Sequence, residues 1–372
     1  MGKRELLIAL AFVIVGAVVY QFSAPPAKTS TSGFSFSKLI DSAKREVRGN
    51  QSYAAPVRHV TFPAGADIMD LRLSGVAGPV TITGEDRADV DVALTVFSTG
   101  ETEAAAVATA NKTKLLEDRV GGALSLRVEF PKEETQTSAM VLKVPRRLAV
   151  RVDGNRETTV TGVRALELLS PARGTTRIEQ IAERVSGTQN GGAITLTGIG
   201  SLKMTLTRTR ARLSAIAGET TLDVQDGDTE IAGSRGALTI DARRGDITIR
   251  AQNGPVKLSG SDGRVRLIDG MGDVSADMRR AEIDAELAPS AAATLSTSDE
   301  ELRVSWRDDA SVRVDAVATN GTINAADWAL TPAQSSSESR VDGAIGRATA
   351  TAPKVSLRNH GANITLKKSS KK

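Results

Sequence analysis

The feature of this sequence that most constrains its fold is a repeat of eighteen residues between positions 202 and 285. When residues eighteen apart are written in columns, mostly apolar columns alternate with polar ones. A fixed period held over five units is typical of a repeat architecture in which each unit packs against its neighbours. One apolar column consists of Leu202, Thr220, Leu238, Val256 and Val274, a second of Met204, Leu222, Ile240, Leu258 and Ala276, and the polar column between them of Lys203, Thr221, Thr239, Lys257 and Ser275.

Each repeat contains a second run with the same alternation. Its inward columns are Ala211, Thr229, Ile247 and Val265, and Leu213, Ile231, Ile249 and Leu267. Because successive side chains of a strand point to opposite faces, the apolar columns face inward and the polar columns outward. We therefore predict an all-β chain that forms a β-solenoid of about 18 residues per coil, with two main strand faces and parallel coils about 4.8 Å apart. A meander of hairpins is the alternative.

Glycines mark one corner of each predicted coil. Gly227, Gly245 and Gly263 keep the period, and Gly174 and Gly192 continue it toward the N-terminus after a slip of one residue near Arg210. Tight turns often require a positive φ, which glycine adopts without strain. We therefore expect these glycines to turn the chain from one strand face to the other.

Other strand-like runs flank the repeat. We predict a mostly-β N-terminal cap domain at residues 53–150, interrupted by a helix at about 101–117. The solenoid itself is expected over residues 151–301. Residues 302–372 form a C-terminal β cap with a basic tail. Such caps are needed because one coil does not bury its inner face alone.

The N-terminus predicts attachment to a membrane. After a cytoplasmic stub at residues 1–4, residues 5–22 read as a signal anchor or transmembrane helix with an unbroken apolar run, and 23–52 as a linker with a short amphipathic helix. Residues before the anchor are basic, which favours an inside N-terminus. We expect a single-pass protein of a bacterial membrane with its main domain extracytoplasmic. A cleaved signal peptide is the alternative.

Three segments carry a resemblance to a known family. They are GPVTITG (78–84), VPRRLAVRVDG (144–154) and KVSLRNHGANITL (354–366), with the repeated coils between them. Together they resemble a bacterial family of adhesin-like β-solenoid domains of unknown function, over about residues 55–368. The resemblance implies an envelope-associated β-solenoid with a binding role. It implies no catalytic or ligand-binding residues.

The composition offers few residues for catalysis. The chain has no cysteine and only two histidines, so a thiolate metal site is excluded and a histidine-based triad would have to use His59 or His360. We predict no catalytic residues, no metal site and no cofactor. A divalent cation held by stacked acids is the alternative, but arginines near those acids favour neutral ion pairs. Continuous basic stripes with aromatic residues are missing, so nucleic acid is not an expected partner.

Six outward positions on the coils are candidates for surface interaction, and together they would contact an envelope polymer or an envelope protein. We predict that the protein binds or scaffolds cell-envelope components without catalysis. Self-assembly through end-to-end β-stacking is the alternative, and a polysaccharide-active enzyme is a further one. The six residues are Lys203, Asp223, Asp241, Lys257, Arg212 and Arg266.

Overall fold

The structure of the protein is a computed structural model that describes residues 52–153, 157–270 and 273–369. All of them lie in one compact unit, Ile40–Lys372. They form 27 strands and one α-helix, so the predicted all-β class is confirmed. Within these ranges no helix is long and apolar enough to cross a membrane. The predicted anchor at residues 5–22 lies outside the described residues.

The N-terminal region consists of nine strands, an α-helix and a 3₁₀ turn. Its elements are β1 (Ser52–Ala54), β2 (Arg58–Pro63), β3 (Asp70–Ser74), β4 (Val80–Glu85), β5 (Asp89–Thr99), α3 (Glu103–Ala110), β6 (Lys114–Val120), β7 (Ala123–Glu129), η1 (Glu133–Thr135), β8 (Gln136–Pro145) and β9 (Ala149–Val152). The helix is shorter than predicted because residues 114–117 join β6, which pairs antiparallel with β7. Pairing with a neighbouring strand here overrides helix propensity.

The repeated region follows. Its strands are β10 (Glu157–Thr161), β11 (Ala165–Leu168), β12 (Thr175–Asn190), β13 (Ala193–Thr207), β14 (Arg210–Ile216), β15 (Thr220–Gln225), β16 (Asp228–Ala232), β17 (Leu238–Arg250), β18 (Val256–Gly270) and β19 (Val274–Leu287). We refer to residues 174–287 as the coil stack.

The C-terminal region completes the chain. Its elements are β20 (Ala293–Ser298), β21 (Leu302–Trp306), β22 (Val312–Thr319), β23 (Ile323–Asn324), η2 (Ala326–Trp328), β24 (Ala333–Gln334), β25 (Glu338–Ile345), β26 (Lys354–His360) and β27 (Ile364–Lys368).

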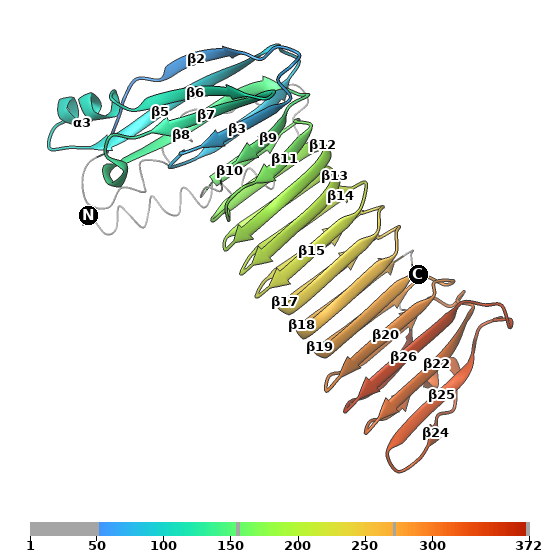
Figure 1. Cartoon of the computed structure of the whole chain (residues 1–372). Helices are drawn as coiled ribbons and strands as arrows, with labels where there is room; N and C mark the ends of the chain where they lie inside the picture. Colours follow the sequence, from blue (N-terminus) through green and yellow to red (C-terminus); the bar gives the residue numbers. More distant parts are fainter. Residues whose placement is uncertain (1–51, 154–156, 271–272, 370–372) are drawn as a thin grey trace, which may run out of the picture. The chain divides into compact units, whose positions relative to one another are not determined.

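Strand pairing divides the coil stack into two parallel ladders (Figure 1). Ladder 1 runs through the first halves of β12 and β13, then β14, β16 and the second halves of β17, β18 and β19. Ladder 2 runs through the second halves of β12 and β13, then β15 and the first halves of β17, β18 and β19. Each coil therefore gives one strand to each ladder.

The register between coils is eighteen residues, as the sequence predicts. In ladder 2, Leu238 faces Val256, and Val256 in turn faces Val274. Ala193 faces Arg210, an offset of seventeen, so the predicted slip near Arg210 is confirmed as well. Parallel pairing also crosses both predicted domain boundaries, since β3 pairs with β9 and β19 pairs with β21.

The inward columns of both ladders form a continuous buried core. Ile240 is fully buried and Ile249 exposes 2% of its surface. Arg250, the next residue after Ile249, is exposed and contacts Glu230 of the preceding coil through an Nε–Oε1 distance of 3.5 Å. The alternation between inward and outward positions therefore agrees with the prediction from the columns.

The two ends of the parallel pairing are built out of sequence order. At the N-terminal end β4 lies between β8 and β10, and β3 lies between β7 and β9. At the C-terminal end β26 lies between β20 and β22, as Figure 1 shows, and β27 lies between β21 and β23. In both places a coil is inserted between two coils that are not its neighbours in sequence.

Antiparallel strands cover the outermost parallel strands. At the N-terminal end β5 pairs with β8, β2 pairs with β5, and β6 pairs with β7. At the C-terminal end β25 pairs with β22, and the two-residue β24 pairs with β25. Trp306 is fully buried there, and Trp328 of η2 packs edge-on against it at a centroid distance of 6.4 Å. The parallel ladders therefore do not end on open parallel edges at these positions.

Candidate functional site

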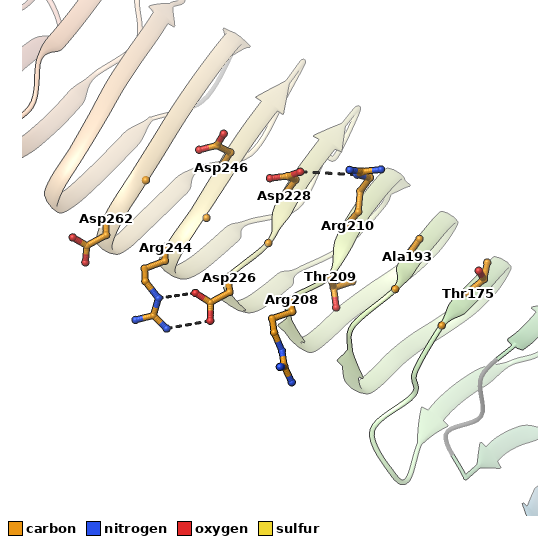
Figure 2. Close-up of a pocket in the computed structure, with 15 residues that line it drawn as sticks. Thr175, Ala193, Arg208, Thr209, Arg210, Asp226, Asp228, Arg244, Asp246 and Asp262 are labelled. Atoms are coloured by element: carbon orange, nitrogen blue, oxygen red, sulfur yellow. Dashed lines mark hydrogen bonds and ion pairs between the residues drawn. The ribbon is translucent and has the colours of Figure 1, made fainter.

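A row of charged residues follows one corner of the coils, where the chain passes from ladder 2 to ladder 1 (Figure 2). We call it the corner row, and its charges alternate in sign from coil to coil. All of its members have a positive φ, between 49° and 57°. This conformation is unfavourable for residues with a Cβ, so the stacking of the coils must hold it. The members are Arg208, Asp226, Arg244, Asp262 and Arg280.

Each arginine of the corner row reaches back to the preceding coil. Arg244 donates to both carboxylate oxygens of Asp226, through Nε at 2.6 Å and Nη2 at 3.1 Å. Arg280 makes the same pair of hydrogen bonds to Asp262, at 2.7 and 3.0 Å. Such two-point contacts fix the orientation of both groups. The corner row thus contains two bonded acid–base pairs, while its third arginine, Arg208, donates from Nη2 to the amide oxygen of Asn190 at 3.0 Å.

These hydrogen bonds perturb the titration of the acids. The guanidinium of Arg244 holds the pKa of Asp226 below its ordinary value, mainly through the hydrogen bond. Arg280 lowers the pKa of Asp262 for the same reason. Both carboxylates therefore stay ionised at neutral pH, and the alternation of charge persists there.

Three of the glycines beside the corner row are required for a different reason from the positive φ that we predicted. Gly174 and Gly192 do have positive φ, but at Gly227, Gly245 and Gly263 the positive φ belongs to the preceding residue. A Cβ on Gly245 would lie 2.6 Å from the carbonyl oxygen of Gly227. Glycine is therefore required at these three corners because consecutive coils approach closely, and not because of the backbone conformation.

An open groove of about 940 Å³ runs along this corner. The glycine backbone from Gly174 to Gly263 lies along its floor, and the corner row flanks it on one side. Figure 2 shows Arg210, Asp228 and Asp246 projecting on the other side of the glycines. The groove therefore presents hydrogen-bond donors and acceptors of both charges along several consecutive coils. It suits a polar ligand that extends along the stack.

Both histidines are exposed, His59 on β2 and His360 at the end of β26, and neither lines the groove. Across residues 52–153, 157–270 and 273–369, no three His, Cys, Asp or Glu side chains gather as a set of metal ligands. Six of the charged side chains that line the groove form ion pairs or hydrogen bonds with other side chains: Arg208, Arg210, Asp226, Asp228, Arg244 and Asp262.

The six residues predicted from the sequence fall on two faces. Lys203, Asp223, Asp241 and Lys257 lie on ladder 2, where Asp223 faces Asp241 directly. Arg212 and Arg266 lie on ladder 1, with Glu230 and Thr248 between them. Arg212 contacts Glu230 at 4.0 Å between Nε and Oε2, and Asp241 contacts Arg243 at 3.7 Å between Oδ2 and Nη2. The structure therefore does not bring the six into one patch.

The corner row was not among the residues predicted from the sequence, although its signal was present there. Positions 208, 226, 244, 262 and 280 alternate between arginine and aspartate at the spacing of the repeat. The alternation repeats every thirty-six residues, twice the period of the apolar columns. A search for a uniform residue type in each column does not detect it.

Comparison with known proteins gives matches at low similarity only. No protein-family model matches the chain, and no curated protein matches it. A structure described as a "putative cell adhesion protein" from Clostridium sporogenes aligns with 9% identity and a TM-score of 0.19, over 86% of this chain and 100% of that one. A "putative adhesin" from Parabacteroides distasonis aligns with 10% identity and a TM-score of 0.28, over 85% and 98%. Another from Bacteroides fragilis aligns with 9% identity and a TM-score of 0.18, over 84% and 97%.

Proposed function

We propose that the coil stack is a β-solenoid that binds an extended polymer of the bacterial cell envelope and does not act on it chemically. The observation that carries this proposal is the groove along the glycine corner. Because coils stack about 4.8 Å apart, the groove repeats its floor at regular intervals. A polymer with repeating units could make similar contacts on several coils, and the contacts would reinforce one another.

The proposal includes a membrane anchor. Residues 5–22 would hold the chain in a bacterial membrane, with the N-terminus inside and the described region outside the cytoplasm. The unbroken apolar run at residues 6–20, with Lys3 and Arg4 before it, supports this arrangement. An adhesin-like or scaffolding role in the envelope follows from such a placement. An envelope protein that offers an extended polar segment is a second partner of the same kind.

Co-sedimentation tests the proposal. The full chain, held in detergent micelles, is mixed with three envelope fractions of its own bacterium: sacculi, outer-layer polysaccharide and membrane vesicles. We expect saturable binding to sacculi or to outer-layer polysaccharide. Arg210→Glu reverses a charge on the groove wall and should weaken binding by about fivefold or more. Arg212→Glu, two residues away on the same strand and outside the groove, is the matched control.

Two outcomes would contradict the proposal. Either no fraction binds, or Arg210→Glu and Arg212→Glu weaken binding equally. Incubation of the same samples with anionic polysaccharides tests the enzymatic alternative, since newly formed chain ends would reveal cleavage.

Self-association remains the second candidate, and one observation favours it. The outermost strand β6 is largely exposed, and Val120 at its end exposes 67% of its surface. An exposed strand at a sheet edge can pair with another copy of the chain. Sedimentation velocity over a range of concentrations would detect such pairing. A sedimentation coefficient that does not change with concentration would exclude it.

A further inference from the structure

Three cationic side chains surround one carboxylate on β22. Arg358 and Lys354, both on β26, contact Oδ2 of Asp315 at 3.0 and 3.1 Å. Arg340, on β25, approaches Oδ1 at 3.8 Å. The Asp315 side chain is only 13% exposed, whereas the three cations are 44–57% exposed. The carboxylate therefore holds three cations together at a surface that remains open to solvent. We call this group the Asp315 cluster.

The Asp315 cluster has an excess of positive charge. Asp342 lies directly across from Asp315 on β25, and Arg313 lies directly across from Lys354. With these two included, the group has a net charge of +2 (4 − 2). Its four basic residues are Arg313, Arg340, Lys354 and Arg358, and its two acidic residues are Asp315 and Asp342. In the corner row, by contrast, each bonded acid has its own base. An uncompensated surplus of this kind attracts an anion.

The cations also retain hydrogen-bonding capacity. An ammonium carries three N–H groups, and the contact with Asp315 occupies one of those on Lys354. Arg358, by contrast, directs Nη1 to the main-chain oxygens of Asp315 and Leu357 and Nη2 to the Asp315 carboxylate. Arg358 thus acts as the positioning residue of the cluster, and Lys354 is the cation best placed to contact a ligand.

Lys354 also lines a hollow of about 450 Å³ on ladder 2. Lys257 lines the same hollow. The acidic residue of the lining, Asp273, accepts a hydrogen bond from the main-chain nitrogen of Ala292. The remaining lining residues are small, apolar or hydroxyl-bearing: Ala237, Leu238, Thr239, Pro255, Val256, Val274, Ser275, Ala292, Ala293 and Thr294. The hollow is within the size range of ligand sites, and no aromatic ring lines it for base stacking.

We propose that this hollow and the Asp315 cluster form a binding site for an acidic glycan. Lys257 and Lys354 would contact its anionic groups as point charges, while the hydroxyls of Thr239, Ser275 and Thr294 would contact its hydroxyls. Ala237, Pro255 and Ala292, the apolar lining residues that are not part of the buried core, would pack against the C–H faces of the sugar rings. The site shares no residue with the groove along the glycine corner. A result that contradicts the acidic-glycan site therefore does not contradict the proposed function of the groove, and the reverse also holds.

The test measures binding of the full chain, in detergent micelles, to oligogalacturonate, with neutral dextran as the uncharged reference. We expect saturable binding of oligogalacturonate that weakens as salt is added. Lys354→Gln and Lys257→Gln should each weaken it by about fivefold or more, because each removes a charge contact. Lys354→Arg should restore most of the affinity. Lys203→Gln is the matched control, since it lies in the same outward column as Lys257 but outside the hollow.

Three results would overturn the proposal. The first is equal binding of oligogalacturonate and neutral dextran. The second is an equal loss of affinity in Lys203→Gln and Lys257→Gln. The third is binding to vesicles that contain anionic lipid without binding to oligogalacturonate, which would assign the site to a membrane surface. Circular dichroism and melting curves of each variant show that a loss of binding does not come from unfolding.

Discussion

The middle of the coil stack and its two ends are made from the same kind of strand but are assembled differently. In the middle, each coil pairs with the coil that follows it in sequence, as Leu238 pairs with Val256. At the C-terminal end, Leu295 pairs with Leu357, sixty-two residues later, because β26 enters between β20 and β22. At the N-terminal end, Val80 likewise pairs with Met140. The middle is thus held by local contacts and the ends by contacts distant in sequence.

The stacking of successive coils and the closing of the two ends of the stack therefore depend on different kinds of contact. A repeat propagates by placing one more coil on the last, and its register follows from the period. Closing the stack requires contacts that the period does not specify. Five variants test the distinction, from the largest expected effect to the smallest.

Deleting residues 354–372 removes both inserted strands, β26 and β27. The buried side chains of Val355, Leu357, Ile364 and Leu366 are lost, and β20 and β22 lose their common partner. We expect amide hydrogens from β20 to β25 to lose protection from exchange, while β17 and β18 keep theirs. Deletion of the last three residues alone is the control. Retained protection in β20 would show that the inserted coil does not hold this end together.

Ile249→Asp places an unpaired charge in the core of the middle region. Ile249 exposes only 2% of its surface, so we expect a loss of about 3 kcal/mol or more in stability. Arg250→Asp, one residue later and exposed, brings an acid toward Glu230 and should cost far less. Thermal melting followed by circular dichroism compares the two. Equal melting temperatures would contradict the inward and outward assignment.

Gly245→Ala tests the close approach of two consecutive coils. The new Cβ would lie 2.6 Å from the carbonyl oxygen of Gly227, which is backbone and has little freedom to move. We expect a loss of roughly 1–3 kcal/mol by overpacking. At Gly65 the nearest atom is Oδ1 of Asp67, a mobile side chain, so Gly65→Ala is the matched control. A variant as stable as the control would mean that the coils are farther apart than described.

Asp315→Asn weakens the hydrogen bonds and charge contacts that hold the cations of the Asp315 cluster. Arg358 lowers the pKa of Asp315, mainly through its hydrogen bond, so the folded state favours the ionised carboxylate. The resulting stability is present above the carboxyl's unfolded pKa of about 3.9 and disappears as pH falls through the lower folded value. We expect the variant to be less stable than the unmodified protein by roughly 1–2 kcal/mol at pH 6. The gap should narrow at pH 2.5, and melting curves at the two pH values measure it.

Arg244→Gln removes a bonded pair of the corner row and should have the smallest effect. Arg244 is exposed and Asp226 is partly exposed, and ion pairs at such positions contribute little and are screened by salt. We expect the melting temperature to fall by about 1 °C or less at low salt. A fall as large as that of Gly245→Ala would mean that the corner row, and not the close packing beside it, fixes the turn.

The sequence predicts the middle of the molecule well and its closure poorly. The inward columns, the register of eighteen and the slip near Arg210 follow from alternation and period, because the partner of each residue is one coil away. The insertion of β26 between β20 and β22 leaves no periodic signal, since other strands intervene in the chain. The helix at α3 was predicted too long for a related reason, because β6 is defined by its pairing with β7.

Prediction of the candidate sites is limited in the same way, since it succeeds only for residues that lie one coil apart in the sequence. The corner row was readable in principle, because its members are one coil apart. The Asp315 cluster could not be predicted from the sequence. Its residues come from three strands, β22, β25 and β26, and the spacing of residues along the chain does not reveal how these strands pair. Only Lys257, among the residues predicted for surface interaction, lines the hollow beside that cluster.

The insertion of β26 and β27 has a consequence for the order in which this protein can be made. A ribosome produces β20 to β25 before it produces the two strands that must enter between them. The C-terminal end must therefore stay open, or reopen, until residue 368 has emerged, whereas the middle coils can stack as soon as they appear. A chain cut short by premature termination would carry a vacant slot between β20 and β22.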